Sequence, residues 1–426
     1  MKELQTIVAE AERARASGKA IALATVVGIK GSAYRLPGAR MLIADGEWIA
    51  GSISGGCLED DVVLRATEAI KQDAALVTTY DTTSDDDIVF GVGLGCKGVI
   101  TILIEPIRPN GVGLDFLEFA KACLENRASG AVATLIQVEG QVNARIGSRM
   151  LARAGALATN IDDGELKAKL TRVIEQPVPP GTSLMPSGTS LMPPGSSTPP
   201  PGSSMMPSGS SLMPSGRSLM PSDSSPMAPG TSQIALAHGS VGVFVERIEP
   251  PTPLVLFGAG HDAMPVVRLA KELGWHVTVV DHRPAYATPA RFPLADRLLV
   301  AAPEDVPAQL SLAEETLALV MTHNYLRDLK LLELLLPSPL RYVGQLGPRK
   351  RTEQLLADLG QRGIHPEPEQ LNRLYAPVGL DIGSESPSEV ALSMLAEMQA
   401  VITGRDGGFI RARKSHIHSR NGPPVL

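Results

Sequence analysis

The sequence has few cysteines, no long apolar run and no excess of positive charge. Three cysteines in 426 residues are too few for a disulfide framework, and the spacing of Cys57, Cys96 and Cys123 matches no zinc-binding pattern. The longest apolar runs fall far short of the roughly 18 residues that a membrane-spanning helix needs. The formal net charge of −6 creates no general attraction to nucleic acid or anionic lipid. We therefore expect neither nucleic acid nor a membrane among the partners.

The two end segments of the chain support the same expectation. Met1-Lys-Glu-Leu-Gln5 is a polar helix start without the apolar segment of a signal peptide, so we expect a cytoplasmic protein. Residues 404–426 carry a cluster of basic side chains that we interpret as a solvated tail. With 43% hydrophobic residues, the chain is long enough and apolar enough for two or three domains.

The most informative stretch is Gly-Ser-Ile-Ser-Gly-Gly-Cys-Leu-Glu-Asp-Asp-Val at 51–62. It follows a strand-like run at 40–44 and leads into a helical pattern at 62–70, which places Cys57 at or just before a helix N-terminus. Free N–H groups and the helix dipole there favour an anion, either a ligand phosphate or the thiolate itself. The carboxylates of residues 59–61 oppose a second negative charge. A glycine-rich turn around a small buried cysteine is the alternative interpretation.

Two further loops belong to the same predicted domain. The polar loop at 28–38 carries Arg35 and either lines an anionic site or lies in solvent. Phe90-Gly-Val-Gly-Leu-Gly-Cys-Lys-Gly98 places Gly95 and Cys96 directly before a predicted strand at 99–105. Two Gly-Cys loops in one domain can present two thiols to a single ligand. Cys123, in a helical stretch at 114–126, is instead expected in the core.

The chain after residue 130 repeats its first part. The repeat predicts an internally duplicated α/β module with pseudo-twofold symmetry, formed by residues 1–180 and completed by 233–250. The second copy lacks both Gly-Cys loops, so the chemistry is expected in the first copy. Three pairs of segments carry the repeat: 131–136 with 20–26, 147–153 with 38–44, and 241–250 with 98–106.

A low-complexity insert at 181–232 interrupts the second copy. Seven heptapeptides of the type Gly-Thr-Ser-Leu-Met-Pro-Ser run from Gly181 to Pro229. A seven-residue period is typical of coiled coils, but the recurring proline and glycine forbid a continuous helix. We therefore predict a disordered heptapeptide-repeat insert, tolerated in a surface loop, with a methionine-rich metal-binding tract as the alternative.

A second domain is predicted at 251–403. An apolar strand at 254–257 is followed by the turn Gly258-Ala-Gly260-His261 and by a helix, and the next strand ends at Asp281, about twenty residues past the glycines. This order predicts a Rossmann-like, doubly wound parallel sheet, with those glycines, His261 and Asp281 as candidate nucleotide-binding residues. Asp281 either bonds a ribose hydroxyl or simply caps its strand.

Taken together, the motifs resemble those of the XdhC/CoxI family, the maturation factors of xanthine and carbon monoxide dehydrogenases. The resemblance spans nearly the whole chain outside the insert. It is carried by Gly51-Ser-Ile-Ser-Gly-Gly-Cys-Leu-Glu59, Gly93-Leu-Gly-Cys96, Phe257-Gly-Ala-Gly-His-Asp262, Asp281-His-Arg-Pro284, Thr322-His323 and Asp381-Ile-Gly-Ser-Glu385.

This resemblance implies a molybdenum cofactor chaperone rather than an enzyme. Such a protein binds the cofactor, protects it while a partner cysteine desulfurase exchanges an oxo ligand for sulfide, and inserts it into an apo-molybdoenzyme of the xanthine or carbon monoxide dehydrogenase type. It also implies a homodimer.

The resemblance also implies which residues hold the cargo. Cys57 contacts the cofactor and its molybdenum, and Cys96 is the second candidate. The pattern at the second loop departs from the family's usual Gly-Cys-Gly-Gly, because Lys97 replaces a glycine. The remaining cofactor-binding candidates of the first domain are Ser54, Gly55, Gly56, Gly95 and Arg35.

Two other hypotheses stay open. An NAD(P)-dependent oxidoreductase would use Gly258, Gly260 and Asp281, but it leaves the two Gly-Cys loops unexplained and lacks a clear acid–base constellation. An interaction scaffold with an empty Rossmann unit would need none of these residues.

Overall fold

The computed structural model describes residues 1–31, 33–81, 98–108, 114–175 and 230–412. The heptapeptide repeats at 181–229, the loop with Gly95 and Cys96, and the basic tail beyond residue 412 lie outside the described residues. Within the described residues, no helix has the length and apolar character needed to cross a membrane.

The N-terminal module consists of two five-stranded antiparallel sheets with the same topology. The strand order is β3-β2-β1-β5-β4 in the first sheet and β8-β7-β6-β10-β9 in the second, which confirms the predicted duplication. The first copy contains α1 (Lys2–Ala16), β1 (Ile21–Gly31), β2 (Arg40–Ala44), β3 (Glu47–Gly51), α2 (Glu59–Gln72), β4 (Leu76–Asp81) and β5 (Gly98–Ile107). The second contains α3 (Phe116–Glu125), β6 (Gly130–Gly140), β7 (Arg149–Arg153), β8 (Ala156–Thr159), α4 (Gly164–Glu175), β9 (Gly230–Leu236) and β10 (Gly239–Ile248).

The strand registers correct two details of the predicted repeat. Thr25 faces Arg40 as Thr134 faces Arg149, so residues 131–136 correspond to 22–27 rather than to 20–26. On the other side of β1 and β6, Leu23 faces Glu105 and Val132 faces Glu246. The counterpart of Glu105 is therefore Glu246, three residues before the Glu249-Pro250 pair that the sequence comparison matches to Glu105-Pro106.

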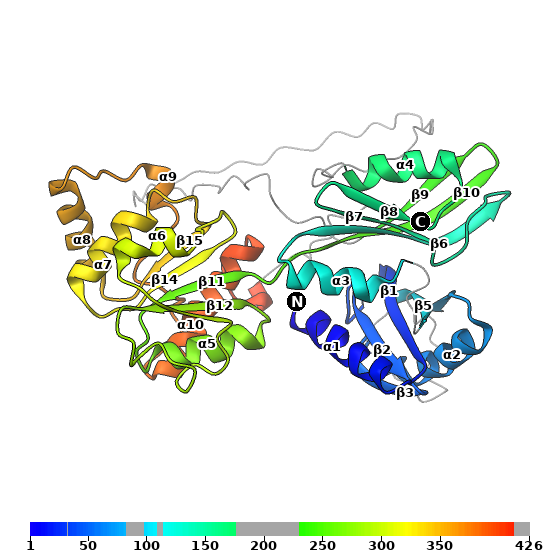
Figure 1. Cartoon of the computed structure of the whole chain (residues 1–426), viewed down its shortest axis with the longest axis horizontal. Coiled ribbons are helices and arrows are strands. Elements are labelled where there is room, and N and C mark those ends of the chain that lie inside the picture. Colours follow the sequence, from blue (N-terminus) through cyan, green and yellow to red (C-terminus); the bar gives the residue numbers. More distant parts are fainter. Residues whose placement is uncertain (32, 82–97, 109–113, 176–229, 413–426) are drawn as a thin grey trace, which may run out of the picture.

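The two sheets pack face to face, and the helices complete the layers (Figure 1). One helix, α2, covers the outer face of the first sheet, and α4 covers the outer face of the second. A shared core between the sheets also contains α1 and α3, with Cys123 buried as predicted. Because both faces of β1 are covered, its apolar run is continuous rather than alternating.

Two buried ion pairs cross between the sheets. Arg40 of β2 pairs with Glu246 of β10, and its counterpart Arg149 of β7 pairs with Glu105 of β5. All four side chains are almost completely buried. Burial raises the pKa of Glu105 because desolvation penalises its charge, while Arg149 and Arg40 act in the opposite direction. Each sheet therefore supplies the arginine that neutralises the other sheet's glutamate.

The C-terminal domain is a Rossmann-like doubly wound sheet, as predicted. All six strands are parallel, in the order β13-β12-β11-β14-β15-β16, which is the dinucleotide-fold order 3-2-1-4-5-6. The strands are β11 (Pro253–Phe257), β12 (His276–Asp281), β13 (Arg297–Val300), β14 (Leu317–Val320), β15 (Tyr342–Gln345) and β16 (Leu374–Tyr375). The α-helices are α5 (Ala263–Glu272), α6 (Val306–Gln309), α7 (Tyr325–Leu335), α8 (Arg349–Gln361), α9 (Pro368–Leu371) and α10 (Pro387–Thr403), with 3-10 turns at Pro303–Asp305 and Ile410–Ala412.

Helices cover both faces of this sheet. One face packs against α5 and α10, and the other packs against α6, α7 and α8. The final helix begins with a capping box between Ser386 and Glu389, with a proline at the first helical position.

Between the two domains, Lys2 pairs with Glu272 and the Gln5 amide donates to the Gly274 carbonyl oxygen at 3.3 Å. The start of α1 therefore contacts the end of α5 (Figure 1).

The crossed pairs predict that a single substitution destabilises the N-terminal module much more than a double substitution that removes both partners. Arg40→Met leaves Glu246 buried without a partner, and we expect it to lower the free energy of unfolding of the module by roughly 3–5 kcal/mol. Arg40→Met combined with Glu246→Leu should recover most of that loss. Urea unfolding followed by Trp48 fluorescence in a Trp275→Phe background measures the N-terminal module alone, because the chain has two tryptophans.

A matched control is Arg108→Met, which removes an exposed pair with Asp73. We expect it to cost less than about 1 kcal/mol. A double variant as unstable as Arg40→Met would contradict the assigned role of the crossed pairs.

Candidate functional site

The loop with Cys57 connects β3 to α2 and starts in close contact with β2. Gly51 has a φ of +73°, and a Cβ atom at this position would lie 2.2 Å from the Arg40 carbonyl oxygen. Only glycine can therefore begin the loop here. The position of the loop is thus tied to the strand whose Arg40 side chain joins the two sheets.

The buried carboxylate of Glu59 holds the loop from inside. It accepts hydrogen bonds from the backbone N–H groups of Ile53 (3.3 Å), Ser54 (2.9 Å) and Leu58 (3.1 Å), and also from the Ser54 hydroxyl. Burial acts to raise the pKa of Glu59, but these hydrogen bonds outweigh it and lower the pKa below its usual value. The carboxylate is therefore an ionised anchor for the loop.

The Ser54 hydroxyl oxygen accepts hydrogen bonds from the backbone amides around Cys57. It accepts from the N–H groups of Gly56 (3.2 Å), Cys57 (3.1 Å) and Leu58 (3.2 Å), and the Cys57 Sγ lies 3.4 Å away. The loop's own side chains thus take the N–H groups of residues 56–58, directly before the first turn of α2, and an anion at the N–H groups of that turn stays a prediction. The alternative of a buried cysteine is wrong, because Cys57 is exposed.

Arg35 has a structural partner. Its guanidinium pairs with Glu3 of α1, and the other carboxylate oxygen of Glu3 accepts the Ser52 N–H at 3.1 Å. Arg35 therefore links its loop to α1 and to the Cys57 loop. The Tyr34 ring lies about 3.8 Å from where a Cβ of Gly55 would stand, and Tyr34 is 68% exposed.

The glycine turn of the Rossmann domain is closed against its own sheet. Gly258 has a φ of +112°, and a Cβ there would lie 2.4 Å from the Met321 carbonyl oxygen. Asp281 accepts the Ala259 N–H on one carboxylate oxygen and bonds Arg283 through both, at 2.8 to 2.9 Å. Burial acts to raise its pKa, but these hydrogen bonds lower it to about 2. In this structure both oxygens of Asp281 are engaged within the protein.

A second contact spans the carboxyl edge of the sheet. Asp262, at the N-terminus of α5, lies 2.7 Å from the Nε2 atom of His323, which follows β14 and has a φ of +55°. Gly260 is close to the same carboxylate, since a Cβ there would lie 2.4 Å from the Asp262 Oδ1 atom. The exposed His261 lies next to this contact in the turn. The contact joins the loop after β11 to the loop after β14.

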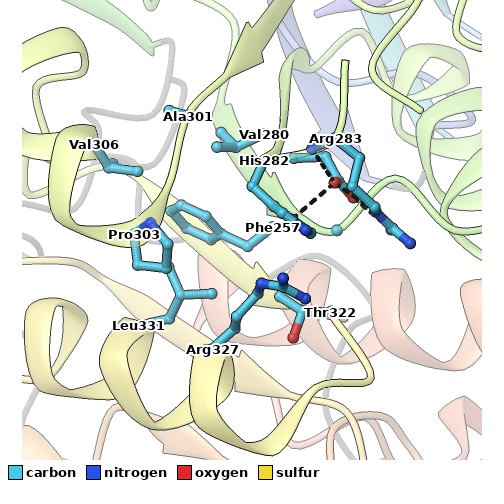
Figure 2. A pocket seen from close by; sticks show the side chains of 12 residues that line it. Phe257, Val280, His282, Arg283, Ala301, Pro303, Val306, Thr322, Arg327 and Leu331 are labelled. Atoms are coloured by element: carbon cyan, nitrogen blue, oxygen red, sulfur yellow. Dashed lines mark hydrogen bonds and ion pairs between the residues drawn. The ribbon is translucent and has the colours of Figure 1, made fainter. Parts of the chain in front are cut away.

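Beside this contact, a pocket opens on the face of the sheet covered by α6 and α7 (Figure 2). Its volume is about 340 Å³, including space open to solvent. The floor is apolar and the rim carries cationic and imidazole side chains. The lining consists of Phe257, Gly258, Val280, Asp281, His282, Arg283, Ala301, Pro303, Val306, Thr322, Arg327 and Leu331.

The predicted site residues fall into two places in two domains. The buried Ser54 and the exposed Gly55, Gly56 and Cys57 form one loop, and Gly258 and Asp281 line the pocket. Sequence reasoning missed Arg327, although a cation in the first turn of the helix after β14 is a signal that could have found it. The part of the chain that the structure describes contains no group of three His, Cys, Asp or Glu side chains that could hold a metal ion.

Known proteins share both halves of this architecture. The sequence profile of the XdhC Rossmann domain matches residues 254–398, and that of the XdhC and CoxI family matches residues 14–81. A probable xanthine dehydrogenase subunit of Bacillus subtilis is 31% identical over 378 residues, covering 88% of this chain and 91% of the relative. The chain belongs to the XdhC and CoxI family.

Two further likenesses fit this assignment. The molybdenum cofactor insertion chaperone PaoD of Escherichia coli is 33% identical over 104 residues, which cover 24% of this chain and 32% of PaoD. A crystal structure of a xanthine dehydrogenase from Bacillus halodurans has a TM-score of 0.68 and 24% identity, covering 94% of this chain and 97% of that one. This crystal structure therefore shares the fold of both domains of the chain.

Glu59 should be essential for the order of the Cys57 loop. Glu59→Ala leaves the N–H groups of Ile53 and Ser54 and the Ser54 hydroxyl without their acceptor, so we expect a loss of roughly 3 kcal/mol in the stability of the module. Hydrogen exchange at Gly56 and Cys57 should become faster as well. Asp60→Ala changes an exposed carboxylate in the same turn and is the control. Equal effects of the two substitutions would show that Glu59 does not anchor the loop.

Asp281 should stabilise the Rossmann domain fully above about pH 4 and progressively less below it. Its pKa of about 2 in the folded protein lies below the ordinary value of 3.8, so its contribution is complete above the unfolded pKa and is lost as the pH falls towards 2. Asp281→Asn should cost about 2 kcal/mol at pH 7 and almost nothing at pH 2. Urea unfolding across this pH range, followed by Trp275 fluorescence in a Trp48→Phe background, measures the difference. The exposed Asp305→Asn is the control, and a pH-independent cost of Asp281→Asn would refute the linkage.

Proposed function

We propose that this protein is a maturation chaperone that binds molybdenum cofactor as cargo and inserts it into an apo-molybdoenzyme of the xanthine or carbon monoxide dehydrogenase type. Family membership supports the role, as do the names of the relatives in Bacillus subtilis and Escherichia coli. The observation that carries the proposal is the exposed Cys57 thiol on a loop held in place from inside by Glu59.

The chemistry of this loop suits a carrier. A thiolate is a soft ligand suited to a transition metal such as the molybdenum of the cargo. Because Ser54 and Glu59 already satisfy the loop amides, Cys57 can be presented without rearrangement of the backbone. Exposure of the thiol keeps the contact open to exchange, so the cargo can pass from this protein to its target.

The remaining candidate contacts have different standing. Gly55 and Gly56 leave room beside Cys57, while Arg35 would have to leave Glu3 to reach the anionic cargo. Cys96 lies outside the described residues together with Gly95, and we propose that it supplies a second thiol from the second glycine-rich loop.

The proposal extends to the setting of the reaction. The protein protects the cofactor while a cysteine desulfurase replaces an oxo ligand with sulfide, and it acts as a cytoplasmic homodimer. It is an accessory protein and not the catalyst. The Rossmann domain takes a nucleotide at its carboxyl edge, where a parallel sheet of this order places ligands.

The alternative of an NAD(P)-dependent oxidoreductase has less support. Asp281, which would hold the ribose, already binds Arg283 and the Ala259 amide. The contact between Asp262 and His323 lies where the pyrophosphate would pass. The oxidoreductase alternative also leaves the Cys57 loop unexplained.

Cargo content provides the test. The protein is purified anaerobically from a host that makes the cofactor, and molybdenum and pterin are measured per chain. Wild type should carry both, Cys57→Ala should lose most of each, and Cys123→Ala should retain them because Cys123 is buried in the core.

Two outcomes would contradict the proposal. Full cargo in Cys57→Ala would remove Cys57 from the site. A wild-type protein without molybdenum or pterin but with bound nicotinamide nucleotide would favour the oxidoreductase.

A further inference from the structure

The pocket on the α6–α7 face combines an apolar floor with a charged mouth. Phe257 and Val280 form part of the floor, at the carboxyl ends of β11 and β12. At the mouth, Arg327 extends from the first turn of α7 towards Phe257 and His282 (Figure 2). A ligand that fills this space needs an apolar ring for the floor and a polar group for the rim.

The guanidinium of Arg327 is the unbalanced charge of this pocket. Among the described residues, no carboxylate lies within 4.0 Å of the Arg327 guanidinium. The Arg327 backbone N–H donates to the Asn324 side-chain oxygen at 3.1 Å. The neighbouring Asp328 does not neutralise it, because that carboxylate is engaged by Thr322, Gln345 and Arg351.

The other polar groups at the mouth are either paired or neutral. Arg283 is held by Asp281 and lies over the Tyr286 ring at 3.6 Å. Burial and then the charge of Arg327 lower the pKa of His282, so the imidazole is neutral near pH 7. Among the lining residues that the structure describes, Arg327 is therefore the free cation, and it has a neighbouring imidazole that can bond an anionic oxygen.

The path that a dinucleotide would follow out of this pocket is closed. In a sheet of this order, a pyrophosphate lies at the N-terminus of the helix after the first strand. Here the carboxylate of Asp262 occupies that helix start, bonded to His323 of the loop after β14. The carboxylate repels an anion and the contact spans the crevice.

We propose that this pocket binds a nucleoside monophosphate, with the base on the apolar floor and the phosphate on Arg327, and that it does not bind a dinucleotide. The free guanidinium of Arg327 matches a single phosphate, and the engaged Asp281 leaves no ribose acceptor of the kind that NAD requires. This inference deepens the nucleotide part of the proposed function and does not depend on the molybdenum cargo.

Calorimetric titration of the full chain tests the inference. The probes are AMP, GMP, CMP, inorganic phosphate, NAD⁺ and NADP⁺. We expect at least one monophosphate to bind with a Kd below about 1 mM, and inorganic phosphate and both dinucleotides to bind at least tenfold more weakly. Loss of a charge-assisted hydrogen bond in Arg327→Gln should weaken monophosphate binding by about 10- to 100-fold. The exposed Arg349→Gln, at the same edge of the sheet but outside the pocket, should bind as wild type does.

Several results would overturn the inference. They are failure of all three monophosphates to bind at about 5 mM, tighter binding of either dinucleotide, equal binding of inorganic phosphate, and unchanged affinity in Arg327→Gln. Arg327→Lys keeps the charge and should retain part of the affinity, and Trp275 fluorescence in a Trp48→Phe background shows whether each variant is folded. Molybdenum and pterin content measured on Arg327→Gln separates the two proposals, because the cargo should be unaffected when the nucleotide is lost.

Discussion

The crossed pairs Arg40–Glu246 and Arg149–Glu105 are the constraint on which the N-terminal module depends. A buried charge without a partner costs several kcal/mol, and each half of the module carries one arginine and one glutamate that only the other half can neutralise. The two sheets therefore form a single unit. The same constraint fixes β2 through Arg40, and the backbone of Arg40 leaves room only for glycine at the first residue of the Cys57 loop.

The loop itself differs from a phosphate-binding loop in the direction of its amides. In a phosphate loop the N–H groups point outwards to the ligand, but here Ser54 and Glu59 draw them inwards. The result is a hydrogen-bonded loop that presents one exposed side chain rather than a set of amides for an anion. The Rossmann domain shares this feature. Asp281 accepts a hydrogen bond from the glycine turn, which other proteins leave open to a nucleotide.

Much of this architecture could be predicted from local sequence patterns. The duplication, the parallel sheet and the capping box at Ser386 follow from periodicity and from short motifs. The register of the repeat could not be predicted, because Glu-Pro occurs at the end of both strands while the partner of Arg40 is Glu246. Nor could the inward amides of the Cys57 loop, since they depend on where the Ser54 and Glu59 side chains point. Arg327 was missed because its isolation depends on Asp328 turning to other partners.

The duplication also explains where the chain tolerates extra length. In the first copy, residues 73–75 join α2 to β4, whereas in the second copy residues 176–229 join α4 to β9. Closing the longer connection costs only about 2–3 kcal/mol more, because loop-closure entropy grows with the logarithm of length. That cost falls on the copy without the cysteine loop. At this connection the added length therefore lies away from the loop that carries Cys57 in the sequence of the module.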